Sequence, residues 1–272
     1  MKTLKDHTIF YDAVCPMCRA YTGVFIKTGM LDEKGRDTYQ HMTQAYASMI
    51  DMGKAVNEIA LINRNTGAVH YGIDSMFLVF ENSFPAFKPL LACRPFKWLA
   101  GKLYKFISYN RRVIIPSSSD GEGHAPAFHS GYRMAYLVFA WVFTAFILFN
   151  YSHLLNDMMP GSNFYREFVI CGGQVFWQWL FISIWNRNRT WDYIGNMMTI
   201  SSAGGLLLLP ALLLSAFVDM NSIFYAVYFL FIAALMLVEH IRRTKLLGIK
   251  SGISITWVLY RLILLIVLLY VQ

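Results

Sequence analysis

The chain has few charged residues for its length. Of its 272 residues, 15% are charged and 56% are hydrophobic, whereas a soluble domain usually has about a quarter charged residues. The deficit is uneven, because residues up to about Gly131 are mixed in composition and the remainder consists mainly of long apolar runs. This distribution excludes a single soluble domain. At roughly 100 to 200 residues per domain, the length predicts two domains with a break near the middle.

Cysteine is also scarce. The sequence has 4 cysteines, of which Cys15 and Cys18 form a C-x-x-C pair while Cys93 stands alone. A structural zinc site needs two further ligands at similar spacing, and the histidines of the N-terminal half supply no such pair. We therefore expect no metal and no cofactor. Half of a zinc site, or a pair that packs without redox cycling, are the alternative interpretations of the two cysteines.

Two further absences narrow the class of protein. Residues 1–7 lack the apolar run of a signal peptide, and the C-x-x-C follows too soon for one to fit, so we expect no cleavable signal. The formal net charge is +8, but the basic residues cluster beside the apolar runs, as membrane topology alone would produce. We therefore expect no nucleic-acid partner.

The C-terminal half has the composition of a membrane domain. Crossing a bilayer takes about 20 residues of helix, and five apolar segments approach or exceed that length. They are residues 134–154, 167–185, 197–218, 222–239 and 253–271. We predict an all-α transmembrane helix bundle of about five helices over residues 132–272, in contact with the membrane lipid bilayer.

The loops between these segments predict an orientation. Arg187 and Arg189 lie between the second and third segments, and a cluster of Arg and Lys at 242–250 lies between the fourth and fifth. The alternate loops lack Lys and Arg away from the membrane edge. By the positive-inside rule the basic loops are cytoplasmic. The sequence thus predicts a multi-pass protein of the cell inner membrane, of bacterial type, with a cytoplasmic N-terminal domain.

A few polar residues lie within the apolar segments. Arg261 falls near the middle of the last segment, where a charge costs about 2.5 to 3.5 kcal/mol on insertion scales. We expect it to face the bundle, with Glu239, Asp192 or Gln174 as candidate partners. Gln174 and Gln178 indicate either a pocket for a quinone or lipid, or hydrogen bonds between helices. A quinone is accordingly a candidate partner.

Residues 1–115 have the alternating pattern of a small α/β domain. Expected elements are strands at 7–11, 38–42, 58–63 and 68–71, helices at 19–27, 44–52 and 72–80, and amphipathic helices over 89–110. Asp74 is the expected N-cap of the helix at 72–80. This order is that of a minimal thioredoxin fold, and a C-x-x-C beside such a pattern is a redox signature. Residues 116–131, rich in Ser and Gly, are expected to form a flexible linker.

The position of the C-x-x-C assigns a role to each residue. It lies where a strand passes into a helix, and unpaired N–H groups and the helix dipole stabilise a thiolate there. Cys15 is therefore the predicted attacking thiol, at the exposed end of the helix, and the more buried Cys18 resolves the mixed disulfide. Pro16 suits the first helical turn. Asp12 either accepts a proton from Cys18 or shapes the loop, and we favour the second role.

The N-terminal domain resembles a known family. The matching residues are Tyr11-Asp12-x-x-Cys15-Pro16-x-Cys18, Tyr71-Gly72-Ile73-Asp74-Ser75-Met76 and Tyr104-x-x-Ile107-x-x-Asn110-Arg111. Residues 6–115 are similar to the DCC family of predicted thiol-disulfide oxidoreductases, a thioredoxin-like family whose members occur alone and fused to membrane segments. The resemblance implies a membrane-anchored thiol-disulfide oxidoreductase acting on an unidentified protein thiol or disulfide. It also suggests that Arg111 and Arg112 support the last helix, whereas by composition they are a juxtamembrane positive stretch.

This sequence departs from the thioredoxin pattern in two places. No proline precedes the turn at 65–67, so the loop with a cis-proline that faces the C-x-x-C in ordinary thioredoxins has no counterpart. Residues 31–53 match the family weakly. Both departures concern the surroundings of the dithiol, where a substrate would bind.

Other functions fit the same residues. A non-catalytic binding or assembly module, with a thioredoxin-like docking domain anchored in the membrane, would keep its function after Cys15→Ser. A transporter with a regulatory redox domain is disfavoured by the absence of evident repeats. In the reducing cytoplasm a dithiol would act mainly as a reductant or a transient relay. No second cysteine pair lies in the membrane half, which argues against a thiol relay across the bilayer.

Overall fold

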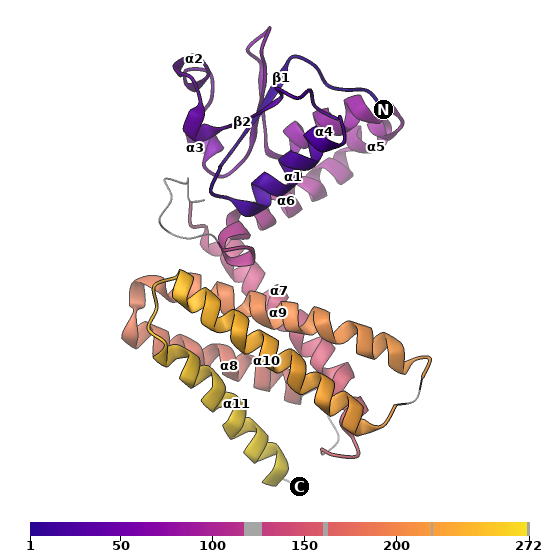
Figure 1. The fold of residues 1–272 in the computed structure, drawn as a ribbon, viewed down its shortest axis with the longest axis vertical. Helices are drawn as coiled ribbons and strands as arrows, with labels where there is room; N and C mark the ends of the chain where they lie inside the picture. Colours follow the sequence, from indigo (N-terminus) through magenta and orange to yellow (C-terminus); the bar gives the residue numbers. More distant parts are fainter. Residues whose placement is uncertain (117–126, 160–162, 219, 271–272) are drawn as a thin grey trace. The chain divides into compact units, whose positions relative to one another are not determined.

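The chain forms two compact units. A computed structural model describes residues 1–116, 127–159, 163–218 and 220–270. The units comprise Met1–Arg133 and Met134–Gln272, and each is described by itself (Figure 1). Of the predicted linker at 116–131, residues 117–126 lie outside the described residues. Ser130 and Gly131 already belong to a helix.

The first unit is built on a four-stranded mixed sheet. Its strands are β1 (His7–Tyr11), β2 (Arg36–Thr38), β3 (Ala60–Asn63) and β4 (Val69–Tyr71), in the order β2-β1-β3-β4. Strand β1 pairs in parallel with β2 and antiparallel with β3, and β3 and β4 form an antiparallel hairpin. Strand β1 lies inside the sheet and is paired with a neighbour on each side. It leads directly into the C-x-x-C, so the dithiol lies at the carboxyl end of an inner strand.

Helices cover both faces of this sheet (Figure 1). The larger layer contains α1 (Pro16–Lys27), α4 (Gly72–Ser83), α5 (Lys88–Ala92) and α6 (Arg94–Ile114), and the smaller contains α2 (Gln44–Ala47) and α3 (Met52–Ala55). Strand residues alternate between the two layers, as the two-residue period requires. Ile9 belongs to the cluster that includes Phe25 of α1, whereas Phe10 belongs to the cluster that includes Ala55 of α3. Two hydrophobic clusters therefore stabilise one sheet.

Three local predictions for this unit are wrong. The strand expected at 38–42 is β2 at Arg36–Thr38, because Tyr39 turns into a 3-10 helix (Tyr39–His41) and is buried against Phe10 at 6.2 Å between ring centroids. The helix expected at 44–52 is divided, because the Asp51 side chain accepts hydrogen bonds from Gly53 and Lys54 and starts α3 anew. The predicted cap Asp74 instead lies in the first turn of α4, which Tyr71 precedes.

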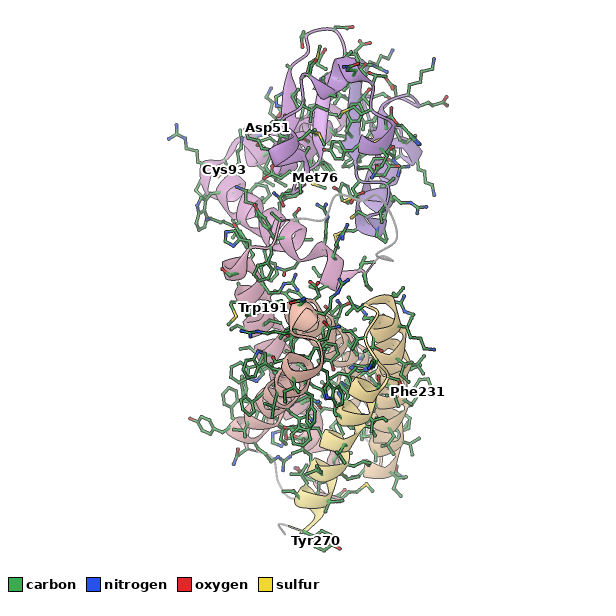
Figure 2. The ribbon with its side chains drawn as sticks, turned by 90° about the vertical axis from the view of Figure 1, so that its left-hand side faces the viewer. Asp51, Met76, Cys93, Trp191, Phe231 and Tyr270 are labelled. Carbon is green, nitrogen blue, oxygen red and sulfur yellow. The ribbon has the colours of Figure 1, made fainter. Side chains whose placement is uncertain are left out.

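The second unit consists of apolar helices. These are α7 (Ser130–Ser152), α8 (Phe164–Trp185), α9 (Thr190–Ser215), α10 (Ser222–Leu246) and α11 (Gly252–Tyr270). The first four, with short flanking turns, are long and apolar enough to cross a membrane, whereas α11 contributes a shorter apolar stretch, Gly252–Leu268. Large apolar side chains point outward along them, including Phe231, which is 58% exposed (Figure 2). This arrangement is compatible with a multi-pass protein in a lipid bilayer, and the count of five spans stays a prediction.

Replacing Gly72 should destabilise the first unit. Gly72 begins α4 with a φ of +57°, and an added Cβ would lie 2.6 Å from Glu58 Oε2 and 3.0 Å from a ring carbon of Tyr104. We expect Gly72→Ala to lower the free energy of unfolding by about 1 to 3 kcal/mol, since non-glycine residues are strained at positive φ. Urea unfolding of the detergent-solubilised chain, followed by circular dichroism, measures this difference.

A second glycine provides the matched control. Gly101 lies inside α6, and its added Cβ would be 3.9 Å from the nearest side-chain atom, on Ile73. Gly101→Ala should therefore stabilise the helix, by about 0.5 to 1 kcal/mol. Equal destabilisation by both substitutions would show that the positive φ of Gly72 is not the cause.

Candidate functional site

The two cysteines lie at the start of α1. Cys15 is the N-cap residue, with extended backbone angles of φ −81° and ψ 108°, and its Sγ accepts a hydrogen bond from the backbone N–H of Cys18 at 3.3 Å. Pro16 occupies the first turn, where its missing N–H leaves no hydrogen bond unmade. The sulfur of Cys15 thus takes the place of the side-chain oxygen that caps most helices. It is directed at the positive end of the helix dipole.

Asp12 shapes the loop that presents Cys15. Its backbone carbonyl accepts from the Cys15 N–H at 3.1 Å, and its Oδ1 accepts from the Val14 N–H at 3.1 Å. The Gln40 side chain donates to the same Oδ1 at 3.0 Å and accepts from the Ala13 N–H at 3.2 Å. The Asp12 carboxylate and the Gln40 amide thus hold the backbone N–H groups of Val14 and Ala13 in place. They favour the structural role of Asp12 over that of a proton acceptor for Cys18.

Arg111 joins this loop to a second one. It projects from α6 with 5% of its surface exposed. Its guanidinium donates to the backbone carbonyl of Val56 at 3.0 Å and to that of Asn57 at 3.3 Å. The same group lies 3.9 Å from Asp12 Oδ2. A buried cation therefore holds the segment between α3 and β3 next to the loop of the dithiol. The resemblance implied that Arg111 supports the last helix, and the contact of Arg111 with the dithiol loop was not predicted.

The cysteines differ in their affinity for a proton. The hydrogen bond from the Cys18 thiol, its backbone N–H and the charge of Arg111 together lower the pKa of Cys15 to about 6, although burial and the charge of Asp12 raise it. The hydrogen bond to Cys15 and burial raise the pKa of Cys18 far above its ordinary value. Near neutral pH, this geometry favours a thiolate on Cys15 and a proton on Cys18, the pairing that thiol-disulfide exchange requires.

The expected exposure of Cys15 is wrong. Both sulfurs are buried, since Cys15 is 6% exposed and Cys18 is 4% exposed, and both belong to the hydrophobic cluster around Ile9. The side chains of Met17 and Met76 pack against the same cluster. Because both sulfurs lie within this packed cluster, a disulfide would have to displace part of it to reach Cys15.

Sequence reasoning missed Gln40 altogether. It lies in the 3-10 helix Tyr39–His41, a segment expected to be a strand, and its contact with Asp12 joins residues 28 positions apart. No local pattern signals such a contact. Tyr104 was noted within the closing motif, and its hydroxyl accepts a hydrogen bond from the Ile59 N–H at 3.2 Å. Tyr104 and Arg111 thus both connect α6 to the segment that leads into β3.

The predicted partners of Arg261 in the membrane unit are wrong. Glu239 pairs with Arg242 and Arg243, and Asp192 lies near Arg189. Gln174 makes no hydrogen bond to Arg261 among the described residues either. Instead, the Arg261 guanidinium lies 3.6 Å from the centroid of the Trp257 ring, in a cation–π contact.

Gln178 forms a hydrogen bond between helices, which was one of its two predicted roles. Its Oε1 accepts from the Tyr193 hydroxyl at 2.6 Å, and that hydroxyl also bonds His240 at 3.0 Å. The Nε2 atoms of Gln174 and Gln178 lack hydrogen-bond partners in the described part of the chain. A quinone carbonyl could accept from such groups, and its binding stays a prediction.

The described ranges contain no group of three or more His, Cys, Asp or Glu side chains that could hold a metal ion. Comparison with known proteins does not add an identity: no family model, curated protein or solved structure matches the chain. The likeness to the DCC family therefore depends on the motif residues alone.

Removing the charge of Arg111 should raise the pKa of Cys15. In the reduced protein with Cys93 replaced by serine, the rate of Cys15 alkylation by iodoacetamide should rise with pH and level off above an inflection near pH 6, the value that the folded protein gives this thiol. In Arg111→Gln the inflection should move toward about 8.5, the ordinary value. Mass spectrometry of the modified peptides measures both rates.

The neighbouring arginine serves as the control. Arg112→Gln removes the same charge one position along α6, and no contribution of Arg112 to the Cys15 pKa is resolved. It should leave the inflection near pH 6. An Arg111→Gln protein of native helix content and unchanged inflection would exclude this guanidinium as a stabiliser of the thiolate.

Proposed function

We propose that the chain is a membrane-anchored thiol-disulfide oxidoreductase whose redox pair is Cys15 and Cys18. The observation that carries this proposal is the hydrogen-bonded pair at the start of α1, where the pKa of Cys15 is lowered to about 6 and that of Cys18 is raised. Dithiols that only pack in a core lack such a division of roles, because burial alone raises the pKa of a thiol.

The surrounding fold supports a thioredoxin-like interpretation. A parallel β1–α1–β2 unit is followed by short helices, the antiparallel β3–β4 hairpin and α4. This is the element order expected of a minimal thioredoxin fold, with the C-x-x-C at the first strand-to-helix junction. Membership of the DCC family is part of the same proposal, and the buried Arg111 of its closing motif supports it through the contact with Asp12.

The proposed reaction is a two-step exchange. The Cys15 thiolate attacks one sulfur of a substrate disulfide, forming a mixed disulfide and releasing the other substrate sulfur as a thiolate. Cys18 then gives up its proton and attacks the Cys15 sulfur, which releases the second substrate thiolate and leaves a Cys15–Cys18 disulfide. The substrate gains two electrons from the dithiol and two protons overall, one released by Cys18 and one taken from water. A thiol or dithiol reductant must restore the Cys15–Cys18 pair for a further cycle.

We place the dithiol on the cytoplasmic side of a bacterial-type inner membrane. Basic residues follow α8 in the short helix Arg187–Arg189 and end α10 at Arg243 and Lys245. Both positions lie on the same side of the bilayer as the start of α7 if each helix crosses once, which the positive-inside rule favours as cytoplasmic. The dithiol would meet its protein substrate on this cytoplasmic side. A quinone bound within the helix bundle is a candidate acceptor for onward electron transfer.

Redox titration should detect a reversible disulfide. In glutathione buffers of graded potential, Cys15 and Cys18 should close at a potential less negative than the about −270 mV of thioredoxin, because a stabilised thiolate favours the reduced form. Cys15→Ser should abolish reduction of a disulfide test substrate such as insulin. Cys18→Ser should accumulate the mixed disulfide, seen by non-reducing electrophoresis, and Cys93→Ser should behave as the unmodified chain.

The alternative is a non-catalytic binding or assembly module with a thioredoxin-like docking domain. The buried position of both sulfurs is the observation that favours it. A pair that never closes in the titration, together with normal partner binding by Cys15→Ser, would replace the enzyme hypothesis with this one.

The orientation has its own test. Cys93 is exposed and occupies the N-cap position of α6, without a capping hydrogen bond from its side chain. A membrane-impermeant maleimide should label it in inside-out vesicles and not in right-side-out vesicles or intact cells. Cys93→Ser should remove the signal, which excludes labelling of the buried cysteines. Labelling from the outer side would contradict the cytoplasmic placement.

A further inference from the structure

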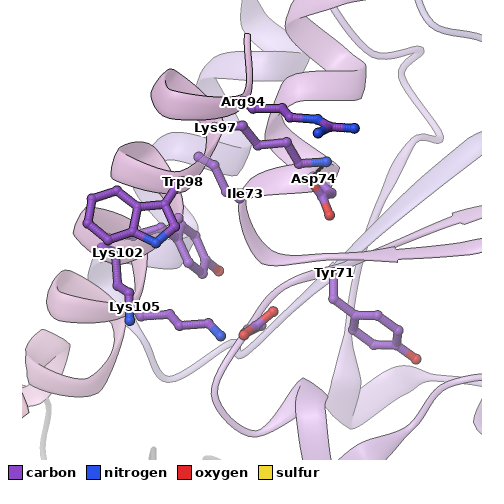
Figure 3. Close-up of a pocket in the computed structure, with 11 residues that line it drawn as sticks. Tyr71, Ile73, Asp74, Arg94, Lys97, Trp98, Lys102 and Lys105 are labelled. Carbon is purple, nitrogen blue, oxygen red and sulfur yellow. Dashed lines mark ion pairs between the residues drawn. The ribbon is translucent and has the colours of Figure 1, made fainter. Parts of the chain in front are cut away.

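A groove in the first unit lies outside the redox site. It has a volume of about 480 Å³ and runs along one side of α6, opposite the residues where β4 passes directly into α4. Figure 3 shows Arg94, Lys97, Trp98, Lys102 and Lys105 projecting from this helix along the groove. Their spacing of three and four residues places them on neighbouring positions of the helix surface.

The groove carries an excess of positive charge. Its lining includes four basic side chains, all from α6, and two carboxylates, those of Glu58 and Asp74. Lys97 forms an ion pair with Asp74 at 2.8 Å. Arg94, Lys102 and Lys105 form no ion pair among the described residues. Lys105 lies close enough to Glu58 to act on it electrostatically. With both carboxylates counted, the four basic side chains leave the groove with a net excess of positive charge, which favours an anion from outside the chain.

Large apolar side chains are exposed next to these cations. Trp98 is 66% exposed, Leu99 is 60% exposed and Leu103 is 56% exposed. Leu99 and Leu103 are one helical turn apart, and each directly follows a groove residue, Trp98 and Lys102 respectively. Leu99 and Leu103 therefore form an apolar stripe about one turn long, about 100° around the helix from the groove residues that precede them, while Trp98 itself lies among the cations. Exposure of these apolar side chains to water is unfavourable, and such surfaces commonly bind a partner or a membrane.

A helix with an apolar stripe, a Lys- and Arg-rich flank and an exposed tryptophan has the chemistry of a membrane interface. Such helices lie with the apolar side chains at the boundary of headgroups and acyl chains, while the cations contact anionic headgroups. Tryptophan prefers the same depth. The chain also carries four helices long and apolar enough to cross a membrane. A bilayer is therefore present at high effective concentration wherever this chain is inserted.

We propose that this surface of α6 binds anionic phospholipids of the membrane that the chain spans. Arg94, Lys102 and Lys105 contact the phosphate groups, and Trp98, Leu99 and Leu103 enter the boundary between headgroups and acyl chains. The proposal goes beyond the redox function and does not depend on it.

Tryptophan fluorescence of the full chain in lipid nanodiscs tests the proposal. The chain has 7 tryptophans, so the difference between the unmodified protein and Trp98→Phe isolates Trp98. In discs of phosphatidylcholine with phosphatidylglycerol, phospholipids brominated on the acyl chains should quench Trp98 and its emission should shift to the blue. In discs of phosphatidylcholine alone both effects should be small. Raising the ionic strength from about 0.1 M to 1 M, which shortens the Debye length from about 10 Å to about 3 Å, should weaken them.

A charge variant and a matched control complete the design. Arg94→Gln, Lys102→Gln and Lys105→Gln combined should abolish the response to phosphatidylglycerol, because each cation lost lowers the ratio of bound to unbound surface about fivefold. Lys5→Gln, Lys27→Gln and Lys34→Gln combined remove as many exposed charges elsewhere in the same unit. This second variant should respond as the unmodified chain does.

Several results would overturn the proposal. Water-like, unquenched emission in both lipids would show that the surface is in water. Equal quenching in both lipids and in the charge variant would show insertion without recognition of headgroups. Blue-shifted emission without quenching would mean that protein, such as a second copy of the chain, covers Trp98. A response of Trp98 to inorganic phosphate in neutral discs, with none to phosphatidylglycerol, would assign the groove to a soluble anion.

Discussion

The hydrogen bond between Cys18 and Cys15 is the interaction on which the proposed redox chemistry of the first unit depends. A thiolate among apolar side chains has almost no water to stabilise it, so protein donors and charges must do so. The N–H and thiol of Cys18 supply the nearest donors, and Arg111 supplies a positive charge at longer range. Arg111 is held in place by two backbone carbonyls and Asp12. Groups from α1, from the loop before it and from α6 therefore act together on the sulfur of Cys15.

The two units differ in where they place their apolar and polar side chains. In the first unit, apolar side chains fill a cluster on each face of the sheet. In the second, large apolar side chains point outward, and the interior contains a polar network in which Tyr193 bonds both Gln178 and His240. Hydrogen bonds within a helix bundle replace those that lipid cannot offer. The compositional break in the sequence follows this change of solvent.

Features with a local cause were predictable from the sequence. Strand β1, the β3–β4 hairpin and the apolar helices follow from side-chain periodicity and turn residues, and their predicted bounds mostly lie within a few residues of the observed ones. The exceptions are the start of α9 and the end of α10, each seven residues from its predicted position. The location of Cys15 at the start of a helix followed from the strand-to-helix junction, although its N-cap position was not predicted. Contacts between distant segments were not predictable: Gln40 reaches Asp12 from a segment expected to be a strand. The burial of Cys15 was missed for the same reason, since Cys15 belongs to a cluster with residues distant in sequence, such as Leu61 and Val79.

The burial of Cys15 has a consequence for oxidative damage. A thiolate of low pKa reacts readily with peroxides, which convert it first to sulfenic acid and then irreversibly to sulfinic acid, but susceptibility also follows exposure. With 6% of Cys15 exposed, access for a second peroxide molecule is restricted. The neighbouring Cys18 can meanwhile condense with a sulfenic acid to form a disulfide. For the proposed oxidoreductase, the packing that restricts access of a substrate to Cys15 would thus also restrict its irreversible oxidation.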